Sequence, residues 1–498
     1  MRAFLMYENE ELAIQIRSCK SNYNSSLIQD LELDTLCNAM ASGNEFLYKT
    51  TRSALLSGLN NPIDVILYRQ EVLKDCLNNH LAVRKMYNIA VEAIESKNKH
   101  WWIASGRFPS SILFNSVSTL KELMTFLQQI KNLAGEHAGK FTSKGFIRFF
   151  EVLKKELDDE YFNSVQHHLK ELEFRDGILL SAMLGKGNKG TYYTVRKPLN
   201  KKRWLERLFK KKSDVFSFRV SDRDIAGTKA LGEIKDEGIN SIANTVAQST
   251  DHIINFFTKF REELAFYIGC LNLYDLLIQI NEPVVFPVPA EKNERIHSFQ
   301  GLYDVCLTLT MKQKITGNDA SLNAKNLVII TGANKGGKTT FLRSIGLAQL
   351  MMQCGMFVAA ESYTANICDS LFTHFRREED RTMESGKLDE ELKRMNEIVD
   401  HITPNSLLLF NESFAATNER EGSEIARQII SALFERGIRI FFVTHLIEFA
   451  NHFSGTQGVC FLRADRQPDG TRTYKLIEGK PLQTSFGEDL YYKIFTRE

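Results

Sequence analysis

One eight-residue segment constrains the fold of this chain more than any other. It runs from Gly332 to Thr339, reads G-A-N-K-G-G-K-T, and fits the pattern G-x-x-x-x-G-K-[ST] at every fixed position. The apolar run Leu327–Ile330 precedes it, and a helical apolar pattern opens at Thr340. This strand–loop–helix context is the one that a phosphate-binding loop requires. The segment therefore predicts a nucleoside triphosphate site, and the alternative is a glycine-rich turn with an incidental lysine.

The residue types of this loop explain the predicted binding. Glycines let backbone N–H groups approach phosphate oxygens, and the start of the next helix adds a positive dipole. Lys338 is expected to reach the terminal phosphates, and the Thr339 hydroxyl is expected to ligate Mg²⁺. The expected nucleotide-binding residues of the loop are Gly332, Ala333, Asn334, Lys335, Gly336, Gly337, Lys338, Thr339 and Thr340.

Two further strand-like runs end in polar residues. Ser406–Phe410 is followed by Asn411 and Glu412, and Ile438–Val443 is followed by Thr444 and His445. The carboxyl ends of parallel strands gather ligands at one edge of a sheet. We therefore expect Glu412 to act as the base for an attacking water, and His445 to sense the γ-phosphate. A structural histidine is the alternative for His445.

Asn411 stands where many phosphate-loop ATPases have an aspartate that holds Mg²⁺ through water. Its amide can still accept a hydrogen bond from a magnesium-bound water, but it supplies no charge. Two outcomes remain open on this basis. One is slow hydrolysis of the nucleotide, and the other is binding with little turnover.

These segments together resemble the MutS family of DNA mismatch repair ATPases. The family loop T-G-P-N-M-G-G-K-S-T is similar to Thr331–Thr340, which reads T-G-A-N-K-G-G-K-T-T. The family motif L-x-L-x-D-E-x-G-x-G-T is similar to Leu407–Thr417, and its T-H element matches Thr444 and His445. Asn411 and Ala416 depart from the second motif at fixed positions, and further similar elements are Tyr474–Leu476 and Ser485–Gly487.

The resemblance implies further roles. Gln353 occupies the position of a linker glutamine, and Asn318 with Asp319 looks like a pair near the nucleotide base. Ser385 and Gly386 resemble a signature loop that, in the family, contacts the γ-phosphate held by another subunit. The later Ser-Thr of that loop is replaced here by Leu388–Asp389. The resemblance thus implies ATP and Mg²⁺ as cofactors and a homodimer with shared nucleotide sites.

The expected architecture has two parts. Residues 1–280 are predicted to form a mostly α-helical core with lever arms, and residues 281–498 an α/β P-loop NTPase domain of ABC/MutS type that also dimerises. Within the first part, residues 242–280 carry an unbroken apolar helical pattern. A continuous helix of that length would reach about 58 Å. The resemblance to the MutS family implies that such helices hold the DNA-facing parts at a distance from the ATPase domain.

A basic insert lies between the arms, at residues 186–219. It contains twelve Lys or Arg residues against Glu206 and Asp214, and aromatic residues interleave with the charges. This pattern is compatible with binding the phosphate backbone of DNA and stacking on bases. A solvated hairpin without a partner is the first alternative. An anionic membrane or an acidic protein is the second.

Composition sets the remaining expectations. No apolar run is long enough for a bilayer span, the N-terminus turns acidic early, and the eight cysteines include no C-x-x-C pair. A cytoplasmic location follows as the expectation, and no membrane partner is expected. We expect a shortened MutS-like ATPase that lacks the N-terminal mismatch-recognition domains and an appended nuclease domain, and that couples dimer closure to DNA binding. The alternative is a nucleotide-gated scaffold with little hydrolysis that grips a protein partner.

Overall fold

The structure is a computed structural model of the chain that describes most of its residues. The described residues are 2–18, 22–23, 25–101, 108–175, 177–197, 216–377, 386–467 and 470–481. The chain forms two compact units. The first comprises residues 1–3, 84–139 and 148–261, and the second comprises residues 4–83, 140–147 and 262–498. The sequence-based division at residue 280 stays a prediction.

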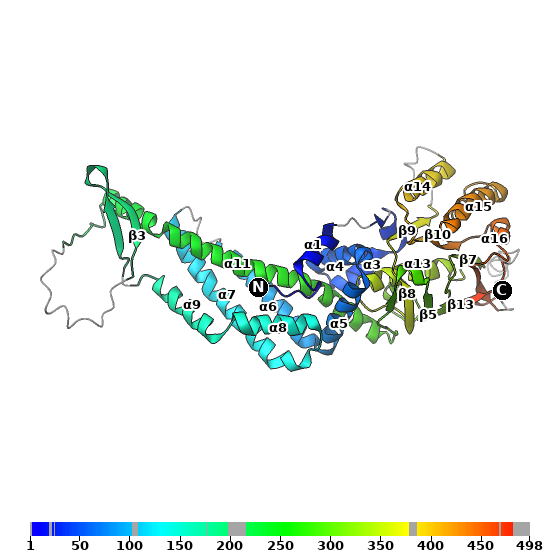
Figure 1. Cartoon of the computed structure of the whole chain (residues 1–498), viewed down its shortest axis with the longest axis horizontal. Helices are drawn as coiled ribbons and strands as arrows, with labels where there is room; N and C mark the ends of the chain where they lie inside the picture. Colours follow the sequence, from blue (N-terminus) through cyan, green and yellow to red (C-terminus); the bar gives the residue numbers. More distant parts are fainter. Residues whose placement is uncertain are drawn as a thin grey trace, which may run out of the picture. The chain divides into compact units, whose positions relative to one another are not determined.

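The first unit consists of helices and one β-hairpin (Figure 1). Its helices are α7 (Pro109–His137), α9 (Asp159–Glu171) and parts of α6 (His80–Trp101), α8 (Lys144–Glu156) and α11 (Ile225–Gln279). Buried apolar side chains hold them together, and the rings of Phe149 and Phe260 lie 4.9 Å apart between centroids. The hairpin pairs β2 (Leu180–Leu184) with β3 (Gly190–Val195) in antiparallel register. The helices lie where apolar residues recur at helical spacing, as the sequence pattern predicts.

Helix α11 begins 17 residues earlier than the apolar pattern predicts, at Ile225 instead of residue 242. The Oδ1 atom of Asp224 accepts a hydrogen bond from Gly227 N at 2.8 Å, which caps the first turn. The early turns contain Gly227, Gly232 and Gly238, and glycine weakens a helical pattern in the sequence. A side-chain cap therefore extends the helix beyond its apolar stripe.

The second unit has, among its described residues, five N-terminal helices, of which α2 to α5 contact its nucleotide-binding part. They are α1 (Glu10–Ser18), α2 (Leu27–Asp30), α3 (Leu33–Ala41), α4 (Glu45–Ser57) and α5 (Ile63–Asn78). Arg69 on α5 is buried, and its guanidinium donates hydrogen bonds to Met6 O at 3.0 Å and to Cys354 O at 3.2 Å. These contacts tie residues that are far apart in the sequence into one core.

The main sheet of the second unit has seven strands in the order β1-β9-β10-β11-β7-β12-β13. All neighbours are parallel except β12 and β13. The predicted apolar runs become three central strands, which confirms them. The strand bounds are β1 (Asn22–Tyr23), β7 (Leu327–Gly332), β9 (Ser370–Phe375), β10 (Ser406–Asn411), β11 (Arg439–Val443), β12 (Val459–Arg466) and β13 (Arg472–Glu478).

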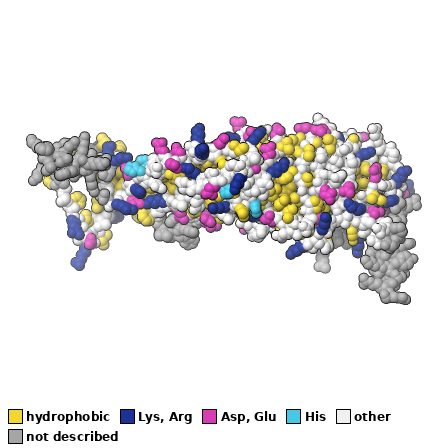
Figure 2. Space-filling model, turned by 90° about the horizontal axis from the view of Figure 1, so that it is seen from below, with side chains coloured by type: hydrophobic (Ala, Val, Ile, Leu, Met, Phe, Trp, Pro, Cys, Tyr) yellow, Lys and Arg dark blue, Asp and Glu magenta, His cyan; other side chains and the backbone are white. Residues whose placement is uncertain are grey.

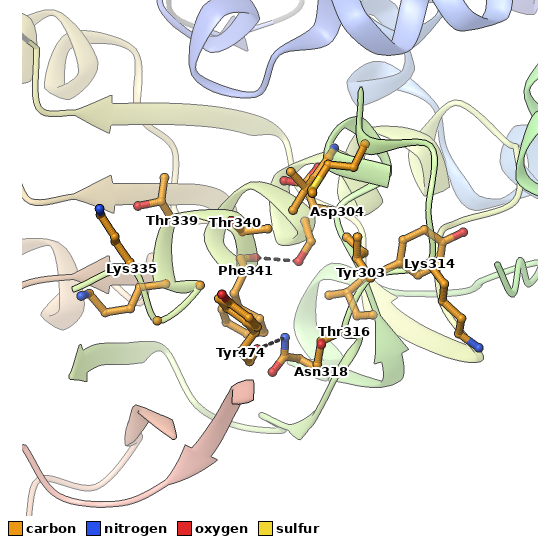
Figure 3. Close-up of a pocket in the computed structure, with 18 of the residues that line it drawn as sticks. Tyr303, Asp304, Lys314, Thr316, Asn318, Lys335, Thr339, Thr340, Phe341 and Tyr474 are labelled. Atoms are coloured by element: carbon orange, nitrogen blue, oxygen red, sulfur yellow. Dashed lines mark hydrogen bonds between the residues drawn. The ribbon is translucent and has the colours of Figure 1, made fainter. Parts of the chain in front are cut away.

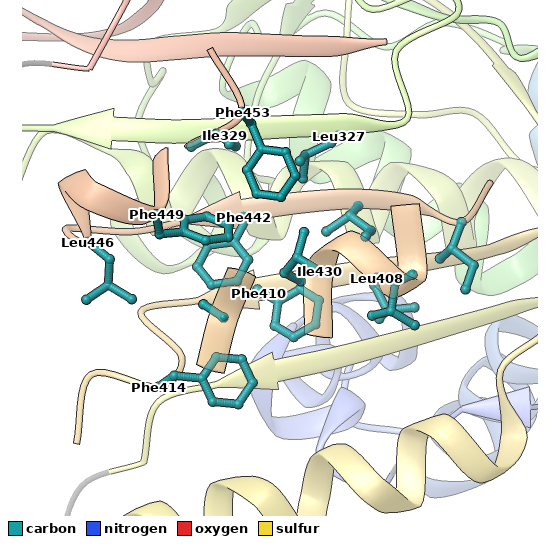
Figure 4. Packing of buried hydrophobic residues seen from close by; sticks show 14 of the residues in the cluster. Leu327, Ile329, Leu408, Phe410, Phe414, Ile430, Phe442, Leu446, Phe449 and Phe453 are labelled. Carbon is teal, nitrogen blue, oxygen red and sulfur yellow. The ribbon is translucent and has the colours of Figure 1, made fainter. Parts of the chain in front are cut away.

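Helices cover both faces of this sheet. Leu408 and Phe410 of β10 point to a core formed with α14 (Lys387–His401), α15 (Glu419–Glu435) and α16 (Ile447–His452), as Figure 4 shows. Leu409 points to the opposite face, where Gly346 of α13 (Lys338–Gln353) packs within contact distance of it. The alternation along β10 thus gives a three-layer α/β/α arrangement that agrees with the expected α/β class.

A second sheet has four strands in the order β4-β8-β5-β6. The strands are β4 (Val288–Ala290), β5 (His297–Leu302), β6 (Asn318–Ser321) and β8 (Ser362–Asn366), and α12 (Val305–Met311) follows β5. The seven cysteines that the structure describes are buried and unpaired. Among the described helices, none combines the length and the apolarity that a bilayer crossing requires.

Candidate functional site

The phosphate loop joins β7 to α13 and has the backbone conformation that its glycines permit. Gly332 and Gly337 have φ values of 111° and 88°, and Lys335 between them has a φ of 59°. A Cβ atom at Gly332 would lie 2.9 Å from Ala464 N of β12, so only glycine fits there without a shift. The loop therefore has the compact, exposed-backbone form that anion binding needs.

Lys338 is the first residue of α13, and its side chain lies inside the loop. Its Nζ atom donates hydrogen bonds to Gly332 O at 2.9 Å and to Ala333 O at 3.0 Å. Burial lowers the pKa of this amine to about 8, against the attraction of Glu412. The ammonium group is thus held by neutral carbonyl oxygens, where a phosphate oxygen would be a stronger acceptor.

A cavity of about 720 Å³ opens beside the loop. Figure 3 shows Lys335, Thr339 and Thr340 on one side of it, with Tyr474 and Asn318 opposite. Tyr303 and Lys314 line the end beyond Asn318. Cavities of this size hold small organic ligands, so the loop and its cavity together could accept both the phosphates and the base of a nucleotide.

The strand ends bring the other predicted residues to the loop. Thr339 Oγ1 donates a hydrogen bond to Asn411 Oδ1 at 3.1 Å. Glu412 Oε1 lies 3.1 Å from His445 Nε2, and Glu412 Oε2 lies 3.9 Å from Arg376 Nη1. The contact with His445, followed by the charges of Lys338 and Arg376, lowers the pKa of Glu412 although burial opposes this. The Glu412 carboxylate is therefore ionised and partnered.

The segment after Glu412 is fixed by contacts with α14 and β9. Ser413 Oγ donates to His374 O at 2.5 Å, and His374 Nδ1 lies 2.7 Å from the same hydroxyl oxygen. Glu391 Oε2 accepts a hydrogen bond from Phe414 N at 2.9 Å. Both Glu412 and Phe414 have positive φ values, 54° and 63°. These side chains thus hold a strained turn that carries Glu412.

Two family models match this chain. One, described as the MutS2 N-terminal domain, matches residues 61–280. The other, described as MutS domain V, matches residues 328–490 and so covers the loop and the strand ends described above. The chain belongs to the MutS family. The resemblance drawn from the loop motif is confirmed by these matches, and the second unit contains a P-loop NTPase-type domain.

Curated members of the family are similar over parts of the chain. A DNA mismatch repair protein MutS from Thermotoga sp. (strain RQ2) is 27% identical over 390 residues, which is 74% of this chain and 47% of the relative. An Endonuclease MutS2 from Thermus thermophilus is 32% identical over 166 residues, 33% of this chain and 22% of the relative. A MutS from Thermotoga neapolitana is 24% identical over 87% of this chain and 53% of the relative. The chain spans about half or less of these MutS-family relatives.

Other predicted site residues lie in different surroundings. Asn318 lines the cavity, but its amide donates to Tyr474 O at 3.4 Å and accepts from Leu476 N at 2.7 Å, which ties β6 to β13. Gln353 ends α13, away from the loop, and its amide bonds to Leu59 O and to Cys368 N and O. Ser385 lies outside the described residues. Contact of these three with a nucleotide stays a prediction in this MutS-family chain.

Sequence reasoning missed three residues of the site. Arg376 follows β9 and faces Glu412, while His374 and Glu391 hold the next turn. A signal for Arg376 existed, because it directly follows Leu371–Phe375, a run of residue types that suit a strand, and so lies at the same sheet edge as Glu412. No comparable signal marked Glu391, which reaches the turn from a helix.

Proposed function

We propose that this chain is a MutS-like ATPase that binds ATP with Mg²⁺, hydrolyses it slowly, and couples closure of a homodimer to DNA binding in repair or recombination. The proposal is supported by the groups that meet at one edge of the main sheet. These are the phosphate loop with Lys338, the Glu412 carboxylate and His445, and they lie beside a cavity large enough for a nucleotide.

Each side chain of the site has a separate role in the proposed hydrolysis. Lys338 exchanges its carbonyl partners for terminal phosphate oxygens and stabilises the charge that develops during transfer. Glu412 orients and deprotonates the attacking water, and His445 keeps the carboxylate in position from 3.1 Å. Thr339 and Asn411 offer two neighbouring oxygen atoms that would hold Mg²⁺. When bound, that ion neutralises charge on the transferred phosphate.

The basic insert supports DNA as the partner. Its described residues are 186–197 and 216–219, and the first of these ranges contains the connection from β2 to β3 and β3 itself. Lys186 and Lys189 lie in that connection, and Tyr192 of β3 is 77% exposed. Elsewhere on the face drawn in Figure 2, Lys and Arg side chains are intermixed with Asp and Glu. A cation-rich hairpin with an exposed aromatic ring suits phosphate contacts and stacking, and such binding weakens as salt rises.

Nucleotide binding and phosphate release with and without DNA test this proposal. Lys338→Ala should abolish ATP binding, whereas Lys229→Ala, which removes an exposed charge from α11, should leave it unchanged. Duplex, branched and single-stranded DNA, each at several salt concentrations, should increase phosphate release to different extents. Sedimentation velocity with and without ATP should show a dimer. Normal ATP turnover by Lys338→Ala would contradict the site assignment.

A nucleotide-gated scaffold for a protein partner is the second candidate. Asn411 favours it, because the strand-end amide supplies no charge to the metal. In this case ATP would still bind, but phosphate release would stay near zero whichever DNA is added. An Asn411→Asp variant that gains turnover would show that the amide restrains hydrolysis, and an increase with DNA in the unaltered chain would exclude the scaffold.

A further inference from the structure

The phosphate-binding site has an unusual balance of charge for a site that is expected to bind Mg²⁺. The two oxygen donors at the metal position, Thr339 Oγ1 and Asn411 Oδ1, are both neutral. Mg²⁺ is usually held by one or two carboxylates together with substrate phosphates. Among the described residues, no group of three or more His, Cys, Asp and Glu side chains forms a metal cluster. The protein therefore offers the ion little charge.

Glu412 lines this cavity and directly follows Asn411 in the chain, and its charge is already partnered. One oxygen lies 3.1 Å from His445 Nε2 and the other lies 3.9 Å from Arg376 Nη1. An ion that took Glu412 as a ligand would compete with these contacts for the same carboxylate oxygens. Glu412 is thus placed as a base for water more favourably than as a metal ligand.

Cationic side chains surround the loop instead. Lys335 and Lys338 belong to the loop, Arg472 Nε donates to Asn334 O at 3.4 Å, and Arg376 stands beside Glu412. The positive charge of Arg472 repels that of Lys338 and so lowers the pKa of the lysine further. The Arg376 side chain is 47% exposed, so it can turn toward a ligand without creating a cavity in the core. Four positive charges thus lie in the loop or next to Asn334 and Glu412.

We infer that this site neutralises the triphosphate with its own side chains, Arg376 in particular, so that nucleotide affinity depends little on Mg²⁺. The inference rests on the proposed nucleotide site and names the charges that govern it. Arg376 contacts the terminal phosphate in place of charge that a metal–aspartate pair would supply. A guanidinium suits this role, because it binds phosphate through two parallel hydrogen bonds. Mg²⁺ would then contribute more to transfer of the phosphate to water than to the affinity for the nucleotide.

Calorimetric titration with ATPγS, in excess Mg²⁺ and in EDTA at equal ionic strength, tests the inference. The unaltered chain should show dissociation constants that agree within about threefold between the two conditions, since Coulomb attraction from side chains is present in both. Asn411→Asp, which is nearly isosteric, should weaken binding about tenfold or more in EDTA and little in Mg²⁺, because its new charge repels bare phosphate.

Variants at Arg376 complete the test. Arg376→Gln should weaken binding about tenfold in EDTA but less in Mg²⁺, and Arg376→Lys should recover part of the loss. Arg436→Gln removes an exposed charge at the end of α15 and should change neither value. Binding of ATPγS only in Mg²⁺, or equal affinities for Arg376→Gln and the unaltered chain, would overturn the inference and leave the proposed ATPase intact. Failure to bind in both conditions would overturn both.

Discussion

Glu391 on α14 supports the turn that carries the proposed catalytic base, because its Oε2 atom accepts a hydrogen bond from Phe414 N at 2.9 Å. Phe414 is itself fully buried, and it stacks on the ring of His374 with a centroid distance of 5.3 Å. Glu412 lies two residues before Phe414 on the same turn. The position of the base therefore depends on a helix that follows the predicted signature loop in sequence.

Glu391→Ala should destabilise the chain by about 1–3 kcal/mol, because it leaves the buried Phe414 N–H without a partner. Glu391→Gln keeps an oxygen at the same reach and should lose less than half as much. Urea unfolding followed by far-UV circular dichroism measures both. Equal losses for the two variants would show that the hydrogen bond is not the cause.

Gly422→Ala should also destabilise the second unit. A Cβ atom at Gly422 of α15 would lie 2.4 Å from Phe414 O, a backbone atom that cannot move alone. The expected cost is about 1–3 kcal/mol, reduced by the better helix propensity of alanine. Gly135→Ala in α7 is the matched control, since nothing lies within 4 Å of its added Cβ, and it should be neutral or stabilising. Thermal melting compares the two.

Nucleotide affinity should weaken as pH rises through about 8. The Lys338 amine has a pKa lowered to about 8 by burial, so the empty site loses its proton there. Phosphate binding needs the protonated form, and binding above this pH must take up a proton, which costs up to about tenfold in affinity for each pH unit. Calorimetry in buffers with different ionisation enthalpies counts that proton. An affinity that stays constant from pH 7 to pH 9 would contradict the assignment.

Replacement of His445 should shift the acid side of the pH–rate profile. Hydrogen bonding to His445 is the largest cause of the lowered pKa of Glu412. A base with a depressed pKa works above that pKa and is lost as pH falls through it. His445→Asn should therefore raise the Glu412 pKa and move the acid limb of kcat to higher pH. A lower kcat with an unchanged acid limb would give His445 a role other than holding Glu412.

The central strands and the phosphate loop could be predicted because local patterns specify them. The run Leu327–Ile330 and the glycines after it fix a strand and a turn with little help from the rest of the chain. The same holds for the strand that ends at Asn411 and for its neighbour that ends before Thr444. Since parallel strands share an edge, the meeting of Glu412 with His445 followed from these patterns.

Other features depend on contacts between distant segments, which no local pattern reports. The amide of Gln353 is satisfied by Leu59 and Cys368, and the amide of Asn318 is satisfied by β13. Polar side chains of these types look alike in sequence whether they bind a ligand or hold two strands. The start of α11 was missed for a different reason. Three glycines weaken the helical pattern there, and the capping hydrogen bond of Asp224 stabilises the first turn despite them.

The position of residues 22 and 23 affects how the chain can be divided for experiments. They form β1, the outermost strand of the sheet that holds the phosphate loop, and they pair with Ser370 and Leu371. A fragment that begins at residue 281 would keep every nucleotide-binding residue yet expose the side of β9 that these two residues cover. Such a fragment should aggregate through that open edge, and co-expression with residues 4–83 should keep it dispersed.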